Sequence, residues 1–223
     1  MARKTTPCPA TTPTEITYIG LDEAFAHFNS ELFGGELPSA LITLQRKART
    51  RGYFSAAKFA RRGSNGSPID EIALNPATFH RRTDPEILST LVHEMVHLWQ
   101  KHCGKRGGRA RRYHDVEWAD RMEEVGLMPT TTGEPGAPRT GDRVTHLIVP
   151  GGAFDLACQA LLAGGRQVIW FQDRTDERSE RLRKAKNASH TLFICLQCCN
   201  QRVRGRPSTR VMCGDCGIPL VAG

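Results

Sequence analysis

The sequence has no apolar run that approaches the ~20 residues needed to cross a membrane. Residues 1–15 also lack the apolar centre of a secretion signal. We therefore expect a cytoplasmic or nucleoid-associated protein, nuclear in a eukaryote, with no membrane partner. Because such compartments are reducing, the eight cysteines are better explained as metal ligands than as disulfides.

Acidic residues are the minority among the charged side chains. The chain has 23 Asp and Glu against 31 Lys and Arg, which gives a net charge of +8 over 223 residues. A basic balance favours an anionic partner, usually nucleic acid, although it also serves solubility alone. The length allows one moderate domain and a second, smaller one.

One predicted helix carries the motif on which the functional interpretation depends. Residues 83–86 form a capping box with proline in the first turn, and apolar residues recur at helical spacing as far as Trp99. His93, Glu94 and His97 lie within it as His-Glu-x-x-His. Residues four apart share a helix face, so both imidazoles can bind one zinc ion while Glu94 takes a proton from a zinc-bound water. The short motif also occurs by chance without a metal.

Two downstream residues are candidates for a third zinc ligand. His114 begins a second amphipathic segment whose apolar face runs from Trp118 to Val125. Glu117 is the alternative, at a spacing that another class of metallopeptidases uses. We favour His114.

Several segments, in this order, resemble the SprT-like zinc metalloproteases, the family that includes Spartan. They are residues 28–38, 51–54, 72–76, 93–97 and 114–118, within a stretch of about residues 15 to 129.

This resemblance implies that His93, His97 and His114 bind the catalytic zinc and that Glu94 is the catalytic base. It also implies a DNA-associated protease that cleaves proteins crosslinked to DNA. The family often has Gly-His-Gly-x-Glu at the third ligand, whereas Tyr113 and Asp115 flank His114 here.

The elements around the motif predict an α+β fold. A helical stripe runs from Leu21 to Leu32, and strands are expected at residues 41–46, 53–59 and 69–74. We predict a zincin-like helical core with a small antiparallel three-stranded sheet, connected as a meander, whose edge holds an extended substrate.

The chain divides into four predicted regions. These are a disordered arm at 1–14, the SprT-like metalloprotease domain at 15–129, a linker and small α/β connector at 130–186, and a β zinc ribbon at 187–223. The connector is expected to contain strands at 144–149 and 167–171, a helix at 154–162 and a charged segment at 174–186. Within it, we interpret His146 as an ordinary strand histidine and Cys158 as a buried apolar residue.

Residues 101–112, between the predicted helix and His114, contain no acidic residue and several glycines. This segment is either a loop that contacts DNA phosphates beside the active site or an exposed flexible loop. Its candidate DNA contacts are Lys105, Arg106, Arg109, Arg111 and Arg112.

Two Cys-x-x-Cys pairs near the C-terminal end predict a zinc ribbon. Cys195, Cys198, Cys213 and Cys216 have the spacing of four thiolates around one structural zinc, and so short a segment needs a metal to fold. A disulfide pairing is the alternative, and Cys199 is a spare cysteine with a wider spacing.

The arm of the ribbon carries four arginines that suit backbone phosphates, unless they form only a solvated hairpin. They are Arg202, Arg204, Arg206 and Arg210. Because Phe193 is the only nearby aromatic residue, we expect DNA binding without sequence specificity.

The sequence thus predicts a zinc-dependent endopeptidase, with one catalytic and one structural zinc, that hydrolyses DNA-bound or DNA-crosslinked proteins. Tyr113, Tyr53 or an arginine is the candidate oxyanion donor. The alternatives are a non-catalytic DNA-binding or regulatory zinc protein, and a metallopeptidase unrelated to DNA.

Overall fold

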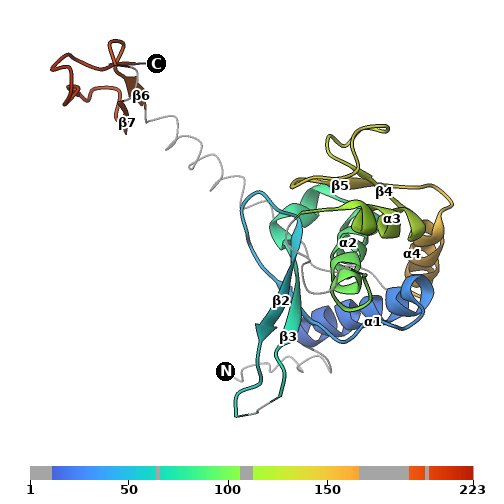
Figure 1. Cartoon of the computed structure of the whole chain (residues 1–223). Coiled ribbons are helices and arrows are strands. Elements are labelled where there is room, and N and C mark those ends of the chain that lie inside the picture. The colour runs from blue at the N-terminus through green and yellow to red at the C-terminus, as the bar shows by residue number, and fades with distance from the viewer. Residues whose placement is uncertain (1–11, 64–65, 106–112, 166–190, 199–200, 223) are drawn as a thin grey trace, which may run out of the picture. The chain divides into compact units, whose positions relative to one another are not determined.

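The computed structural model describes residues 12–63, 66–105, 113–165, 191–198 and 201–222 (Figure 1). The chain forms two compact units, Met1–Gln172 and Asp173–Gly223. No helix among the described residues is long and apolar enough to span a bilayer.

The first helix, α1 (Pro13–Phe33), begins earlier than the apolar stripe predicts. Thr12 caps it, since its backbone N–H donates to Glu15 at 2.7 Å and its hydroxyl accepts from the Glu15 N–H at 3.2 Å. The predicted arm of residues 1–14 is therefore too long at its C-terminal end, and residues 1–11 lie outside the described part. The helix ends at Gly34, whose φ of 64° is left-handed and suits glycine.

The first sheet contains β1 (Leu41–Leu44), β2 (Gly52–Phe59) and β3 (Ile69–Leu74) in the order β1-β3-β2. β1 is parallel to β3 and β2 is antiparallel to it, so the predicted antiparallel meander is wrong and the sheet is mixed. The reason lies in β3. All of its residues but the first are buried, so it takes the centre of the sheet and bonds on both sides. β2 is left as an edge strand.

The central helix of this unit is α2 (Asp84–His102), which follows the short 3₁₀ helix η1 (Pro76–Arg81). It contacts β2 and β3 on one side and α1, α3 and α4 on others, and it runs through the middle of the unit in Figure 1. Its predicted capping box is formed, with the Thr83 N–H donating to Glu86 at 2.7 Å. Every residue from 87 to 98 is buried, so the motif lies in the core.

The remaining elements of this unit are α3 (Val116–Glu124), β4 (Leu127–Thr130), β5 (Thr145–Ile148) and α4 (Ala153–Ala163). β4 and β5 pair as an antiparallel ribbon, and Phe154 of α4 stacks on Phe28 of α1 at 5.5 Å. The described part of the predicted connector is therefore built into the first unit, whose end lies beyond residue 129. The predicted strand at 167–171 and the charged segment at 174–186 lie outside the described residues.

The second unit is a small antiparallel sheet in the order β7-β6-β8. Its strands are β6 (Thr191–Ile194), β7 (Arg202–Gly205) and β8 (Val221–Ala222). The buried core consists of Phe193, Cys195, Cys213 and Leu220. Two cysteines within so small a core suit a fold that depends on a metal.

Candidate metal centres

Three histidines meet in the core of the first unit. His93 and His97 come from successive turns of α2, and His114 comes from the segment just before α3. One ring nitrogen of each lies within 4.8 Å of the others, and all three side chains are buried. The cluster does not include the alternative ligand Glu117.

Glu117 faces the end of α2 instead. Its Oε1 accepts a hydrogen bond from the backbone N–H of Lys105 at 2.7 Å. A carboxylate in this position orders the chain just after α2. Sequence spacing allows Glu117 as a ligand, but α3 begins at Val116 and turns that side chain toward the chain around Gly104.

The position of His114 is fixed by hydrogen bonds of its backbone and of its ring. Its backbone forms an isolated bridge with Gly141, and its ring Nδ1 lies 3.0 Å from the Gly141 carbonyl oxygen. Next to it, Asp115 caps α3 through the Trp118 N–H and accepts from Gln100 of α2 at 2.7 Å. Because a carbonyl only accepts, His114 Nδ1 carries the proton and Nε2 remains for a metal.

Trp118 forms the wall behind the cluster. Its ring centroid lies 4.9 Å from that of His93, 5.3 Å from that of His97 and 4.3 Å from that of His114. The side chain has no exposed surface. The sequence predicts Trp118 as a core residue, and the structure shows that it also limits where all three ligand rings can move.

The cluster favours neutral imidazoles. Burial, and next the neighbouring His146, lower the pKa of His93 well below its usual value. Burial also lowers the pKa of His97 to about 3, and it lowers that of His114. Neutral rings keep a free lone pair at neutral pH, which is the form that binds a metal.

Glu94 follows His93 on α2, and its carboxyl group faces β2, where a Cβ atom at Gly52 would lie 3.1 Å from Glu94 Oε1. It is buried, and burial raises its pKa to about 8, although a hydrogen bond from the Phe54 backbone N–H in β2 opposes this. A carboxyl group with a pKa near neutrality can both take and release a proton. This is the property required of a general base and acid.

The donor set fits zinc. Three buried, neutral imidazoles are a donor set that zinc accepts, and three protein ligands leave one corner of a tetrahedral site for another ligand. The fit rests on the chemistry and convergence of His93, His97 and His114 themselves.

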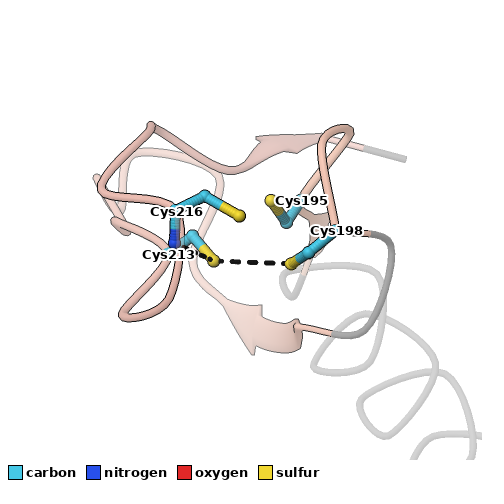
Figure 2. Close-up of side chains that lie close together, drawn as sticks. All are labelled: Cys195, Cys198, Cys213 and Cys216. Carbon is cyan, nitrogen blue, oxygen red and sulfur yellow. Dashed lines mark hydrogen bonds between the residues drawn. The ribbon is translucent and has the colours of Figure 1, made fainter.

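The second centre is a cluster of four cysteines. Figure 2 shows the sulfurs of Cys195, Cys198, Cys213 and Cys216 pointing toward one another, and all lie within 4.8 Å. Cys198 Sγ and Cys213 Sγ are 3.6 Å apart. The thiol of Cys198, followed by desolvation and the other thiols, raises the pKa of Cys216 to about 12. A zinc ion would remove this obstacle to ionisation, so the cluster fits a structural metal.

Two knuckles hold these sulfurs. The Cys195 N–H bonds to the Gln201 carbonyl oxygen at 3.1 Å, and the Cys213 N–H bonds to that of Ile218 at 2.8 Å. Gly217 takes a left-handed φ of 64° in the second knuckle. No disulfide joins the described cysteines of the cluster, and the spare Cys199 lies outside the described residues.

The structure describes only some of the residues predicted to contact DNA. Lys105 is exposed at the end of the α2 segment, and Arg106, Arg109, Arg111 and Arg112 lie outside the described residues. Arg202 and Arg204 lie two apart on β7, so they share a face, and both are exposed. Arg206 and Arg210 follow, also exposed.

Two residues of the site have no signature in the sequence. His146 of β5 lies 3.1 Å from His93, Nδ1 to Nδ1, and Ser89 of α2 lies 2.8 Å from the other ring nitrogen of His146. His146 is on a strand as expected, but it contacts the histidine cluster. It lies 53 residues from His93 in the chain. The contact therefore depends on tertiary structure, in which β5 pairs with β4.

An α+β unit in which a buried His-Glu-x-x-His helix meets a third histidine defines a metalloprotease-like domain. The SprT-like family model matches residues 21–139, more than half of the chain, and the chain belongs to that family. Over 60 residues it is also 52% identical to an uncharacterized protein in the mucB 3′ region of Salmonella typhimurium. That match covers 27% of this chain and 80% of the relative.

Proposed function

We propose that this protein is a zinc-dependent endopeptidase with a zincin-like site that hydrolyses proteins bound or crosslinked to DNA. The observation that supports this best is the convergence of His93, His97 and His114 next to a buried Glu94. A purely structural metal site has no need of a buried acidic side chain next to its ligands on the same helix.

The chain's own groups divide the chemical work. His93, His97 and His114 would hold zinc, which supplies Lewis-acid polarisation of the scissile carbonyl and acidifies a water molecule. Glu94 takes the proton of the attacking water and passes it to the leaving amine. The Phe54 N–H keeps the Glu94 carboxylate oriented. Tyr113 stands next to His114 and is 54% exposed, so its hydroxyl is accessible to a substrate oxyanion.

The edge of the sheet offers a place for the substrate. β2 is an edge strand, and its residue Phe54 contacts Glu94, so a peptide that pairs with β2 would pass beside the base. An extended peptide gains main-chain hydrogen bonds in this way without a need for particular side chains. A peptide complex in which the substrate lies away from β2 would contradict this part of the proposal.

Association with DNA is proposed from charge. Arg202, Arg204, Arg206 and Arg210 give the second unit an exposed basic arm, and its described residues offer little aromatic surface for base stacking. The four cysteines would hold a structural zinc that keeps this arm folded. Binding should then depend on phosphate contacts and not on base sequence.

The test is cleavage of histones and autocleavage, measured with and without single-stranded DNA, for wild type and Glu94→Gln. We expect DNA-stimulated cleavage by wild type and a loss of at least ~10³-fold in Glu94→Gln, with zinc content unchanged. Equal cleavage by the two proteins would refute the role of Glu94. Cleavage that ignores DNA would indicate a peptidase unrelated to DNA. No cleavage by the zinc-loaded protein would favour a non-catalytic zinc protein.

DNA contacts are tested separately by charge reversal. Arg202→Glu with Arg204→Glu tests the ribbon, and Arg109→Glu, Arg111→Glu and Arg112→Glu test the loop. For every arginine that binds a phosphate in wild type, its replacement should reduce the slope of log K against log salt by about 0.7 on single strands. An unchanged slope would show that the altered arginines do not bind phosphates.

A further inference from the structure

We propose that His146 is a positioning residue for the metal ligand His93. Nδ1 of His146 accepts a hydrogen bond from the Nδ1–H of His93, which keeps the proton of His93 on Nδ1 and leaves its Nε2 free for the metal. The inference rests on the proposed zinc site at the three histidines, and it goes beyond that site by giving β5 a part in it.

The contact joins two elements that are distant in the chain. His93 lies on the buried face of α2, and His146 lies on β5, partly exposed. Their Nδ1 atoms are 3.1 Å apart, and the ring centroids are 5.3 Å apart. Two ring nitrogens at this distance form a hydrogen bond only if one carries a proton and the other does not.

The direction of that bond follows from the groups behind His146. The Ser89 hydroxyl donates to the backbone carbonyl of Glu86 at 2.9 Å, and a carbonyl can only accept. Ser89 has then used its one proton, so at 2.8 Å from His146 Nε2 it must accept. His146 therefore carries its proton on Nε2.

The rest of the chain of bonds is then fixed. A neutral imidazole has one N–H, so His146 Nδ1 is bare and accepts. His93 Nδ1 must donate to it, and His93 Nε2 is left with a free lone pair. The hydrogen bonds thus form a chain in which His93 donates to His146, His146 donates to Ser89, and Ser89 donates to the Glu86 carbonyl oxygen.

The surroundings of His146 keep it neutral. Arg51 Nη1 lies 3.4 Å from the hydroxyl of Thr145, the residue before His146. A positive charge this close disfavours a second positive charge on the imidazole of His146. An imidazolium at His146 would donate from Nδ1 and force the proton of His93 onto Nε2, so Arg51 protects the tautomer that binds metal.

His114 has the same arrangement with a different acceptor. Its Nδ1 lies 3.0 Å from the carbonyl oxygen of Gly141, which also leaves Nε2 free. Outer hydrogen bonds of this kind orient metal-binding histidines and raise their basicity. At His114 a backbone carbonyl supplies the bond, whereas at His93 a side chain does, and a side chain can be replaced.

The test measures zinc affinity of the full chain by competition with a chromophoric chelator. His93→Ala identifies the contribution of the histidine site. His146→Leu, which removes the acceptor, should weaken that site by about 10- to 100-fold. His146→Asn, whose carbonyl oxygen can replace Nδ1, should recover most of the loss.

Ser89→Ala removes the hydroxyl that holds the proton of His146 on Nε2, so that His146 can carry its proton on either nitrogen. This variant should give an intermediate loss of zinc affinity. His27→Asn is the matched control, because His27 bonds to the Ala157 carbonyl oxygen instead.

A second measurement needs no variant. Long-range ¹H–¹⁵N spectra of metal-free wild type should show His93 protonated at Nδ1 and His146 at Nε2. His93 protonated at Nε2, or unchanged zinc affinity in both His146→Leu and Ser89→Ala, would overturn the inference. If the His93→Ala protein binds as much zinc as wild type, the proposed zinc site itself is wrong, and the inference about His146 is not what has failed.

Discussion

The backbone N–H of Phe54 in β2 donates a hydrogen bond to the side chain of Glu94 in α2. This bond links the edge strand of the sheet to the base that the proposed reaction needs. It requires the backbone of β2 to approach α2 closely. Gly52, two residues before Phe54, is the position at which the sequence allows this approach.

We predict that Gly52→Ala lowers both stability and cleavage. A Cβ atom at residue 52 would lie 2.8 Å from Thr90 Cγ2, 2.9 Å from the Ala73 carbonyl oxygen and 3.1 Å from Glu94 Oε1. Because one of these neighbours is backbone of the central strand β3, the backbone of β2 at residue 52 must shift, which also changes its contact with Thr90 and Glu94 of α2. We expect a loss of about 1–3 kcal/mol in the free energy of unfolding, measured by urea denaturation. Cleavage should fall by more than the loss of folded protein explains.

Gly20→Ala is the matched control for this substitution. Gly20 lies within α1, and a Cβ atom there would meet nothing within 4 Å. Alanine is the better helix former, so the variant should be more stable by roughly 0.5–1 kcal/mol and cleave as wild type. Loss of cleavage in both variants would show that the effect at Gly52 is not specific to the contact with Glu94.

The helix that carries the candidate site was predictable because its signals are local. The capping box at Thr83, the helical periodicity and the His-Glu-x-x-His pattern lie within one continuous segment, which folds as α2. The capping box at the start of α1 is equally local. Thr12, Pro13 and Glu15 repeat the pattern of Thr83 and Glu86, and α1 begins there. The apolar stripe of α1 starts only at Leu21, however, so periodicity alone predicts a shorter helix.

What could not be predicted is long-range pairing. The order of the strands depends on which strand pairs with a neighbour on both of its sides. The sequences of three short strands do not show which one that is. The place of β5 was missed for a similar reason. It pairs with β4, a strand of four residues with Pro129 inside it, a residue that argues against a strand. Without that pairing nothing brings His146 to His93.

A pH-dependent contribution to stability is predicted for Asp70 of β3. Burial alone would raise its pKa, but hydrogen bonds from Lys101, the Ala57 N–H and His102 outweigh it and lower the pKa below the usual value. Since the pKa is lower in the folded state, the ionised carboxylate stabilises the fold at pH values above about 4. This contribution is lost as the pH falls through the lowered value.

Asp70→Asn tests this contribution. At pH 7 we expect a loss of about 2 kcal/mol in the free energy of unfolding, the size typical of hydrogen bonds to a charged group. The difference from wild type should begin to shrink below about pH 4 and should vanish only as the pH falls through the lowered pKa of Asp70. Both proteins are measured without metal, so that protonation of the histidine cluster affects them alike. A difference that does not shrink at all as the pH falls from 7 to below 4 would contradict the ionic origin.

Capping of α1 gives a third prediction. Thr12→Ala removes the hydroxyl that accepts from the Glu15 N–H, and it should cost about 1 kcal/mol. Thr14→Ala is the control, because Thr14 follows Pro13 in the first turn and is not the capping residue. Thermal unfolding of the two variants distinguishes them. If residues 12–14 belonged to a disordered arm, neither substitution would lower the melting temperature.

The last prediction concerns the two centres together. Cys213→Ser removes a buried thiol from the cysteine cluster, and the small core around Phe193 and Leu220 cannot replace the stabilisation that a metal provides. We expect the second unit to unfold and the zinc content to fall from two ions to one per chain. The first unit has its own core, so its melting transition and its histidine site should be unchanged. His93→Ala should give the converse result, with the histidine site empty and the second unit intact. If Cys213→Ser released both ions, the two centres would not be independent, and a peptidase site carried by the first unit alone would be excluded.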